Sequence, residues 1–79
     1  MKSVDVDGIE FKRVDHGNWI SIGFHKKGTN QPHGVCRQVE KGGVIYEGMF
    51  FDGLLNGYGR IVYRNGNPTG MFKNGDFQN

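Results

Sequence analysis

Two aromatic-rich runs bounded by glycine turns, within residues 46–66, constrain the fold of this chain more than any other feature. Residues 46–51 (YEGMFF) and 58–64 (YGRIVYR) are rich in aromatic and β-branched side chains, which are typical of half-buried strands. The connection at residues 52–57 carries Asp-Gly and Asn-Gly pairs, which favour the positive φ that glycine adopts without steric cost. The pattern predicts an antiparallel hairpin followed by a second reversal at residues 64–67 (RNGN).

Glycine stands at two positions inside these expected strands, Gly48 and Gly59. Strand alternation places Tyr46, Gly48 and Phe50 on one face, and it places Gly59 on the same face of its strand as Ile61. Glycine weakens a strand and often marks the close approach of another group. We therefore expect aromatic rings to lie over these two bare backbone positions.

The spacing of aromatic, acidic and glycine residues in this stretch resembles the MORN repeat (membrane occupation and recognition nexus). The pattern is Y-x-G-x-F-x-D-G-x-x-N-G-x-G-x-x-x-Y-x-N-G. The residues that fit it are Tyr46, Gly48, Phe50, Asp52, Gly53, Asn56, Gly57, Gly59, Tyr63, Asn65 and Gly66. The resemblance implies an elongated, curved, right-handed twisted sheet that is built hairpin by hairpin.

Weaker echoes of the repeat lie on both sides of it. Residues 70–75 (GMFKNG) match residues 48–53 (GMFFDG) at an offset of 22, and residues 23–28 (GFHKKG) match them less closely at an offset of 25. Both offsets are near the repeat period of about 23 residues that the resemblance to the MORN family implies. The chain is thus expected to be a single small domain, residues 1–79, with an N-terminal capping hairpin at 1–18, a degenerate repeat at 19–43, a clear MORN repeat at 44–66 and a partial repeat at 67–79.

The predicted fold class is all-β: a single elongated, twisted antiparallel sheet of consecutive β-hairpins, with little or no helix. No amphipathic stretch or capping pattern of useful length indicates a helix. Fourteen glycines in 79 residues are more than twice the average usage, but ten aromatic residues spaced among them argue against disorder. One cysteine, no targeting peptide and no apolar run of membrane-spanning length predict a cytoplasmic protein, with a position peripheral to a membrane or the cytoskeleton as the alternative.

Little in the sequence predicts catalysis or metal binding. His33 and Cys36 have a ligand-like spacing, but a closed zinc site needs four ligands and no Cys-x-x-Cys pair is present. Nothing around Cys36 predicts a lowered thiol pKa, and the glycines match no phosphate-binding loop. RNA could stack on Trp19, Phe24 or Tyr58, but no ribonucleoprotein motif accompanies them. We therefore predict no enzyme, catalytic residue, metal, cofactor or nucleic-acid partner.

The expected function follows from the single sheet, which has no second layer to cover it. One face must pack on its own aromatic rows, and the concave face offers a groove to a partner. The residues predicted to line this partner-binding groove are Trp19, Tyr46, Phe50, Tyr58, Tyr63 and Phe72. We expect a non-enzymatic MORN-type interaction or scaffolding module, which binds a peptide or helix of a larger assembly or dimerises through its sheet.

Basic residues support an alternative from another class, which is peripheral binding of anionic phospholipid. The candidates are Lys12, Arg13, Lys26 and Lys27. Each suitably placed cation contributes about 1 kcal/mol at an anionic membrane surface. Acidic residues are interspersed among them, and the net charge of +2 is too small to imply a polyanionic partner by itself. A third hypothesis is a structural part of an enzyme that another chain carries.

Overall fold

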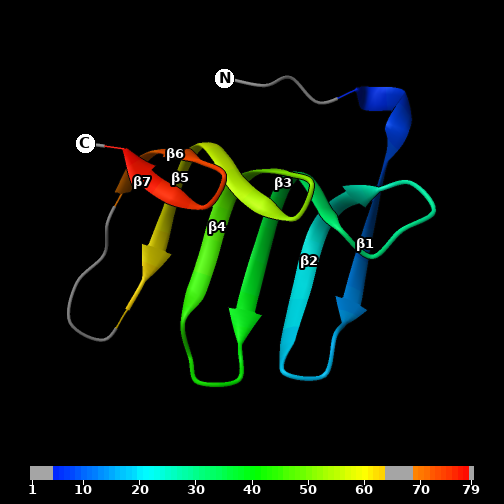
Figure 1. Ribbon diagram of the computed structural model, residues 1–79. Coiled ribbons are helices and arrows are strands. Elements are labelled where there is room, and N and C mark those ends of the chain that lie inside the picture. Colours follow the sequence, from blue (N-terminus) through cyan, green and yellow to red (C-terminus); the bar gives the residue numbers. More distant parts are fainter. Residues whose placement is uncertain (1–4, 64–68, 79) are drawn as a thin grey trace.

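A computed structural model describes residues 5–63 and 69–78. Seven strands form one antiparallel sheet in chain order, so that each strand pairs with the next (Figure 1). The elements are η1 (Val6–Gly8), a 3-10 turn, and the strands β1 (Ile9–Asp15), β2 (Trp19–Lys26), β3 (Pro32–Glu40), β4 (Ile45–Phe51), β5 (Leu54–Val62), β6 (Thr69–Lys73) and β7 (Asp76–Gln78). The predicted fold class, one open antiparallel sheet of consecutive hairpins, is confirmed.

A row of small residues crosses the sheet at mid-height. The strand register places Gly23, Cys36, Gly48, Gly59 and Gly70 side by side on successive strands. A Cβ atom added at Gly48 would lie 2.5 Å from the Cα of Gly59, and Gly48 has a φ of 138°. The atoms that exclude a side chain at Gly48 therefore belong to the neighbouring backbone. The sequence had led us to expect aromatic rings in that place.

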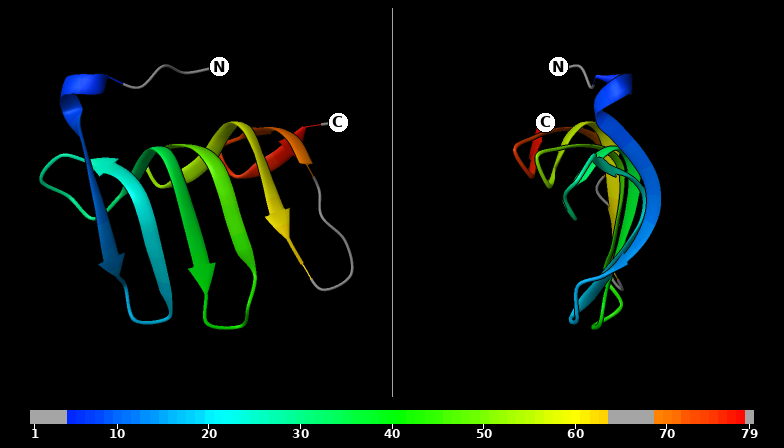
Figure 2. Two further views of the ribbon diagram at one scale, coloured as in Figure 1. Left: turned by 180° about the vertical axis from the view of Figure 1, so that it is seen from behind. Right: turned by 90° about the vertical axis from the view of Figure 1, so that its right-hand side faces the viewer.

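The sheet is strongly curved, and its hairpin tips bend toward one side (Figure 2). The tips are tied to the preceding hairpin by backbone hydrogen bonds: Gly53 N–H donates to the carbonyl of Pro32 over 2.9 Å, and Gly75 N–H donates to that of Leu55 over 2.8 Å. We call the side toward which the tips bend the inner face and the opposite side the outer face. The tips give the inner face a partial cover in place of a second layer.

The hydrophobic core lies on the inner face. Its buried members are Cys36, Phe50, Leu55, Ile61 and Phe72, with Val44 and Tyr46 packed against them. Side chains alternate between the two faces along each strand, so the core residues alternate with residues that point to the outer face. The core is small and draws on strands β3 to β6.

The connection of the central hairpin is shorter than predicted. Only Asp52 and Gly53 form the turn, with φ values of 51° and 89°, and strand β5 already begins at Leu54. Positive φ at both central residues matches the twist of the flanking strands and is typical of a two-residue hairpin. Leu55 is 3% exposed in the core, so burial of this side chain favours strand over loop. Gly57 is not a turn residue but lies within β5, where the pairing with β4 shifts register.

The N-terminal segment also differs from the expected capping hairpin at residues 1–18. Residues 5–8 form local hydrogen bonds with one another. The Asp5 side chain accepts a hydrogen bond from Asp7 N–H over 3.0 Å, and Gly8 N–H donates to the Asp5 carbonyl over 2.9 Å. These bonds form the 3-10 turn, and β1 then pairs with β2. Residues 1–4 and the predicted turn at 64–67 lie outside the described residues.

Candidate functional site

The outer face carries large apolar side chains that are open to solvent. Phe11 is 67% exposed, and Val35 and Tyr58 are each 62% exposed. Ile22 and Met71 on the same face are also exposed. Single exposed apolar residues are ordinary, but a contiguous group on one face of a small protein marks a candidate interaction site.

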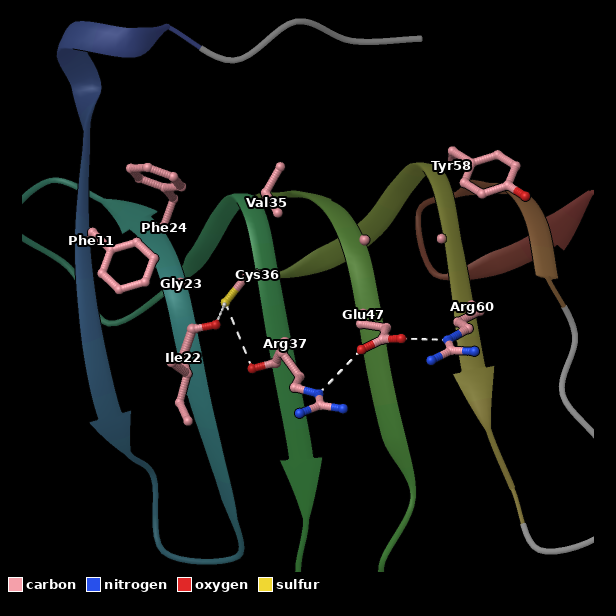
Figure 3. A pocket seen from close by; sticks show the side chains of 12 residues that line it. Phe11, Ile22, Gly23, Phe24, Val35, Cys36, Arg37, Glu47, Tyr58 and Arg60 are labelled. Carbon is pink, nitrogen blue, oxygen red and sulfur yellow. Dashed lines mark hydrogen bonds and ion pairs between the residues drawn. The ribbon is translucent and has the colours of Figure 1, made fainter.

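Phe11, Ile22, Val35 and Tyr58 border a hollow of about 470 Å³, which we call the outer groove (Figure 3). It runs across strands β1 to β5, along the row of small residues. Its apolar wall consists of Phe11, Phe24, Val35 and Tyr58, and its floor consists of Gly23, Cys36, Gly48 and Gly59. Its polar wall consists of Arg37, Glu47 and Arg60, with Ile22 at the end of this wall. The groove exists because the floor has almost no side chains between the two walls.

The polar wall is a ladder of three charged side chains on adjacent strands. Arg37 Nε donates to Glu47 Oε2 over 3.1 Å, and Arg60 Nε donates to the other oxygen, Oε1. The side chains of Arg37 and Arg60 are 54% and 49% exposed. Exposed ion pairs of this kind contribute about 0–1 kcal/mol each. Two guanidinium groups against one carboxylate leave this wall with a net positive charge, which favours an anionic group in a ligand.

Cys36 borders the floor of the groove, and its buried side chain belongs to the core of the inner face, where it is a protonated thiol. Its side chain is 3% exposed, and its Sγ lies 3.4 Å from the carbonyl oxygen of Ile22. Burial raises the pKa of the thiol to about 11. The thiolate needed for nucleophilic or metal chemistry is therefore scarce at neutral pH. In the described part of the chain, no three His, Cys, Asp or Glu side chains come together in a way that could hold a metal ion.

A chain of hydrogen bonds on the inner face joins two histidines through a serine. His25 Nδ1 lies 3.0 Å from the Gly23 carbonyl, to which it must donate, so Nε2 of the neutral ring is an acceptor. Ser21 therefore donates its hydroxyl to His25 Nε2 over 2.5 Å and accepts from His16 Nε2 over 2.8 Å. Burial lowers the pKa of His25. Burial also lowers the pKa of His16, and repulsion from a charged His25 lowers it further.

This serine–histidine pair has the contact of a nucleophile and its base, but it is closed to a substrate. Ser21 and His25 are both 0% exposed. Every polar atom of the pair has a partner within the sheet. At the offset of 25 residues, Ser21 and His25 correspond to Tyr46 and Phe50, so these hydrogen bonds place polar groups where the MORN pattern has two aromatic residues.

The structure does not bring the six predicted groove residues together. Phe50 and Phe72 are each 2% exposed and belong to the core. Tyr46 is half-buried and, with Phe50, borders an inner hollow of about 220 Å³. Tyr58 lies on the outer face, in the apolar wall. Tyr63 follows the end of β5 and is 46% exposed.

Trp19 is separate from the other five. Its ring stacks on the imidazole of His16, with centroids 3.4 Å apart and planes 9° apart. Together they border a third hollow of about 400 Å³ beside the loop at residues 29–31. The predicted groove residues on the inner face therefore divide between the packed core and the borders of two different hollows.

The four basic residues of the lipid hypothesis are also dispersed. Lys12 is paired with Glu10, with Nζ 2.6 Å from Oε1, and Arg13 points to the opposite face because it is the next residue of the same strand. Lys26 is paired with Asp52 over 2.7 Å. Lys27 is exposed at the start of the following turn. No single basic surface results from this arrangement of the four.

The residues of the polar wall were missed by the sequence analysis. Arg37, Glu47 and Arg60 lie on three strands, and only the register shows that they are direct neighbours. The alternation of side chains along a strand could have indicated them. Each of the three is two residues from an exposed apolar residue or one residue from the row of small residues. That signal becomes readable only once the strand boundaries are known.

The comparisons with known proteins agree with the repeat found in the sequence. A family model described as MORN repeat matches residues 46–67, so the resemblance is confirmed for the central hairpin. No curated protein and no solved structure matches the chain. MORN repeats in general mediate protein or membrane-lipid interactions and are generally non-enzymatic. Among the described residues, no helix has the length and hydrophobicity needed to cross a bilayer.

Proposed function

We propose that this chain is a non-enzymatic protein-interaction module, and that its outer groove binds a partner segment with an apolar side chain next to a carboxylate. The observation that carries the proposal is the groove itself. It combines exposed apolar side chains, a floor of bare backbone and a wall with two arginines to one glutamate. The exposed apolar side chains and the two arginines are not part of the core, which lies on the other face.

The apolar part of the ligand is inferred from the wall formed by Phe11, Val35 and Tyr58. These side chains are more than half exposed in the free protein, so a partner that covers them removes apolar surface from water, which is favourable. Burying one leucine or phenylalanine side chain of a partner contributes about 1.5–3 kcal/mol. A hollow of about 470 Å³ accommodates such a side chain on the glycine floor.

The carboxylate is inferred from the unequal charges of the polar wall. Glu47 uses one oxygen for each arginine, through Nε in both cases. The planar guanidinium group has further N–H donors, and bidentate pairing with carboxylate is the geometry that suits it. An acidic group of the partner placed above Glu47 would contact Arg37 and Arg60 together.

Selection from a displayed peptide library tests the proposal without knowledge of the natural partner. The expected consensus is a large apolar residue next to an aspartate or glutamate. Arg60→Gln should weaken the binding of a selected peptide by about tenfold, because a hydrogen bond to a charged group contributes roughly 1.5–3 kcal/mol. Glu47→Gln should strengthen it, because the arginines lose their competing partner.

Tyr58→Ser has a matched control in Leu54→Ser. Both side chains are exposed, 62% and 50% respectively, but Leu54 lies beside the hairpin tip and outside the groove. Tyr58→Ser should abolish peptide binding and Leu54→Ser should leave it unchanged. Equal affinities for the two variants, or a consensus without acidic residues, would show that the outer groove is not the binding site.

Peripheral binding of anionic phospholipid is the competing proposal. It predicts flotation with anionic but not neutral vesicles, and binding that weakens steeply with salt. The matched variant pair is Lys27→Glu, which changes an exposed cation of the lipid set, and Lys41→Glu, which changes an exposed cation outside it. Salt-sensitive flotation that Lys27→Glu loses and Lys41→Glu keeps would support lipid binding over the peptide groove.

A further inference from the structure

Strand β1 is an open edge of the sheet. It is the first strand in the order and pairs with β2, and no other described strand lies beside it. Gly8 accepts from Lys27 N–H over 2.8 Å and His16 N–H donates to Trp19 over 2.8 Å, and these bonds lie just outside the two ends of β1. Hydrogen-bonded positions alternate along an antiparallel pair. The even-numbered residues of β1 therefore bond to β2, and the N–H and C=O groups of Ile9, Phe11 and Arg13 point outward.

The side chains along this edge are suited to pairing with themselves. Glu10 and Lys12 are two residues apart on one face, and they already form an ion pair over 2.6 Å. Phe11 lies between them on the other face, is 67% exposed and meets Phe24 edge-on at 5.3 Å. An antiparallel copy centred on Phe11 would place Glu10 of each chain opposite Lys12 of the other.

The two registers centred on the next residues of β1 are less favourable. Centring the pair on Lys12 would place two lysines opposite each other, and centring it on Arg13 would do the same with two arginines. Like charges directly opposite destabilise a strand pair, whereas opposite charges and aromatic pairs stabilise it. The register centred on Phe11 also makes this residue a hydrogen-bonded position, as its outward backbone groups require.

We propose that two copies of this chain associate through β1, antiparallel and centred on Phe11, to form one continuous sheet of both chains. This deepens the proposed interaction function by naming a second copy as one partner. The two-fold axis would be perpendicular to the sheet, so both outer grooves would lie on the same side. The Phe11–Phe24 contacts of the two chains would meet at the junction.

Sedimentation equilibrium of the full chain over a concentration series tests this proposal through charge reversal. We expect the wild type to dimerise reversibly. Lys12→Glu and Glu10→Lys should each weaken the dimer by about tenfold or more, because each replaces two attractive pairs by two repulsive pairs. A mixture of the Lys12→Glu chain and the Glu10→Lys chain should form a one-to-one heterodimer, since opposite charges then face each other at both sites.

Lys41→Glu is the matched control, because it makes the same charge change at an exposed turn residue that is not part of β1. Circular dichroism should show all variants folded. A wild type that stays monomeric would overturn the proposal. So would a Lys12→Glu chain that dimerises as strongly as the Lys41→Glu chain, or a mixture of the two charge-reversed chains that does not associate. Peptide binding at the outer groove is measured separately on the Lys12→Glu chain, whose groove is intact, so failure of one proposal is distinguishable from failure of the other.

Discussion

Replacing Gly48 by alanine tests how the row of small residues shapes the sheet. The new Cβ would lie 2.5 Å from both the Cα of Gly59 and the carbonyl oxygen of Tyr58, at a φ of 138°. The unfavourable backbone conformation costs about 1–2 kcal/mol and forced overpacking costs about 1–3 kcal/mol. A smaller unfolded-state entropy offsets roughly 0.4–1 kcal/mol of this. We expect Gly48→Ala to lower the free energy of unfolding by about 2–4 kcal/mol.

Two turn glycines separate these contributions. Gly43 has a φ of 96° but no atom within 4 Å of an added Cβ, so Gly43→Ala should lower the free energy of unfolding by about 1 kcal/mol from backbone strain alone. Gly42 has the same open surroundings and a φ outside the region that disfavours side chains. Gly42→Ala should therefore raise the free energy of unfolding by roughly 0.4–1 kcal/mol.

Urea unfolding followed by circular dichroism and by the fluorescence of Trp19 measures all three variants. A domain of this length has a total stability of about 4–12 kcal/mol, so the largest expected loss is a substantial part of it. The free energy of unfolding should decrease in the order Gly42→Ala, Gly43→Ala, Gly48→Ala, and Gly48→Ala should be clearly less stable than Gly43→Ala. If Gly43→Ala and Gly48→Ala unfold at the same urea concentration, close backbone approach does not constrain the row.

Three further predictions concern the inner face. The pKa values of His16 and His25 are lowered in the folded state, so the unfolded chain binds protons first as the pH falls below about 6.5. The free energy of unfolding should therefore decrease as the pH is lowered further. Urea midpoints that do not change between neutral and mildly acidic pH would contradict this. Cys36, whose pKa is raised to about 11, should react with a thiol reagent at mildly alkaline pH only as fast as the protein opens, and denaturant should accelerate the reaction strongly. Phe50→Ala should lower the free energy of unfolding by about 3–5 kcal/mol and Leu54→Ala by less than about 1 kcal/mol; similar losses would show that Phe50 is not a core residue.

The strands and the central turn could be predicted because their signals are local. Aromatic and β-branched runs mark β4 and β5, and Asp52-Gly53 supplies the positive φ of a two-residue turn. The repeat spacing added the number and order of the hairpins. Where a segment contains both a turn signal and a core residue, as at Leu55 beside Asn56-Gly57, local chemistry does not decide between loop and strand. Burial of Leu55 decides it, and burial depends on the whole sheet.

The candidate site could not be predicted because it depends on register and on faces. Tyr58 and Ile61 are three residues apart on one strand, so they face opposite sides, and the sequence does not tell which side is open. The inner face has a partial cover because the hairpin tips bend over it. A register shift between Gly48 and Phe50 separates the glycine row from the tip of the central hairpin, and such shifts are a property of strand pairing. Aromatic residues were therefore assigned to a groove that their own packing fills.

An NMR titration tests the central claim, which is that the outer face is the interaction surface. Backbone amide shifts of the wild-type chain would be followed while a peptide selected from the display library is added. We expect the largest changes along the outer groove, at Gly23, Val35, Gly48, Tyr58 and Gly59, with little change at Trp19 and Tyr46. Changes concentrated around Trp19 and Tyr46 on the inner face would contradict the account.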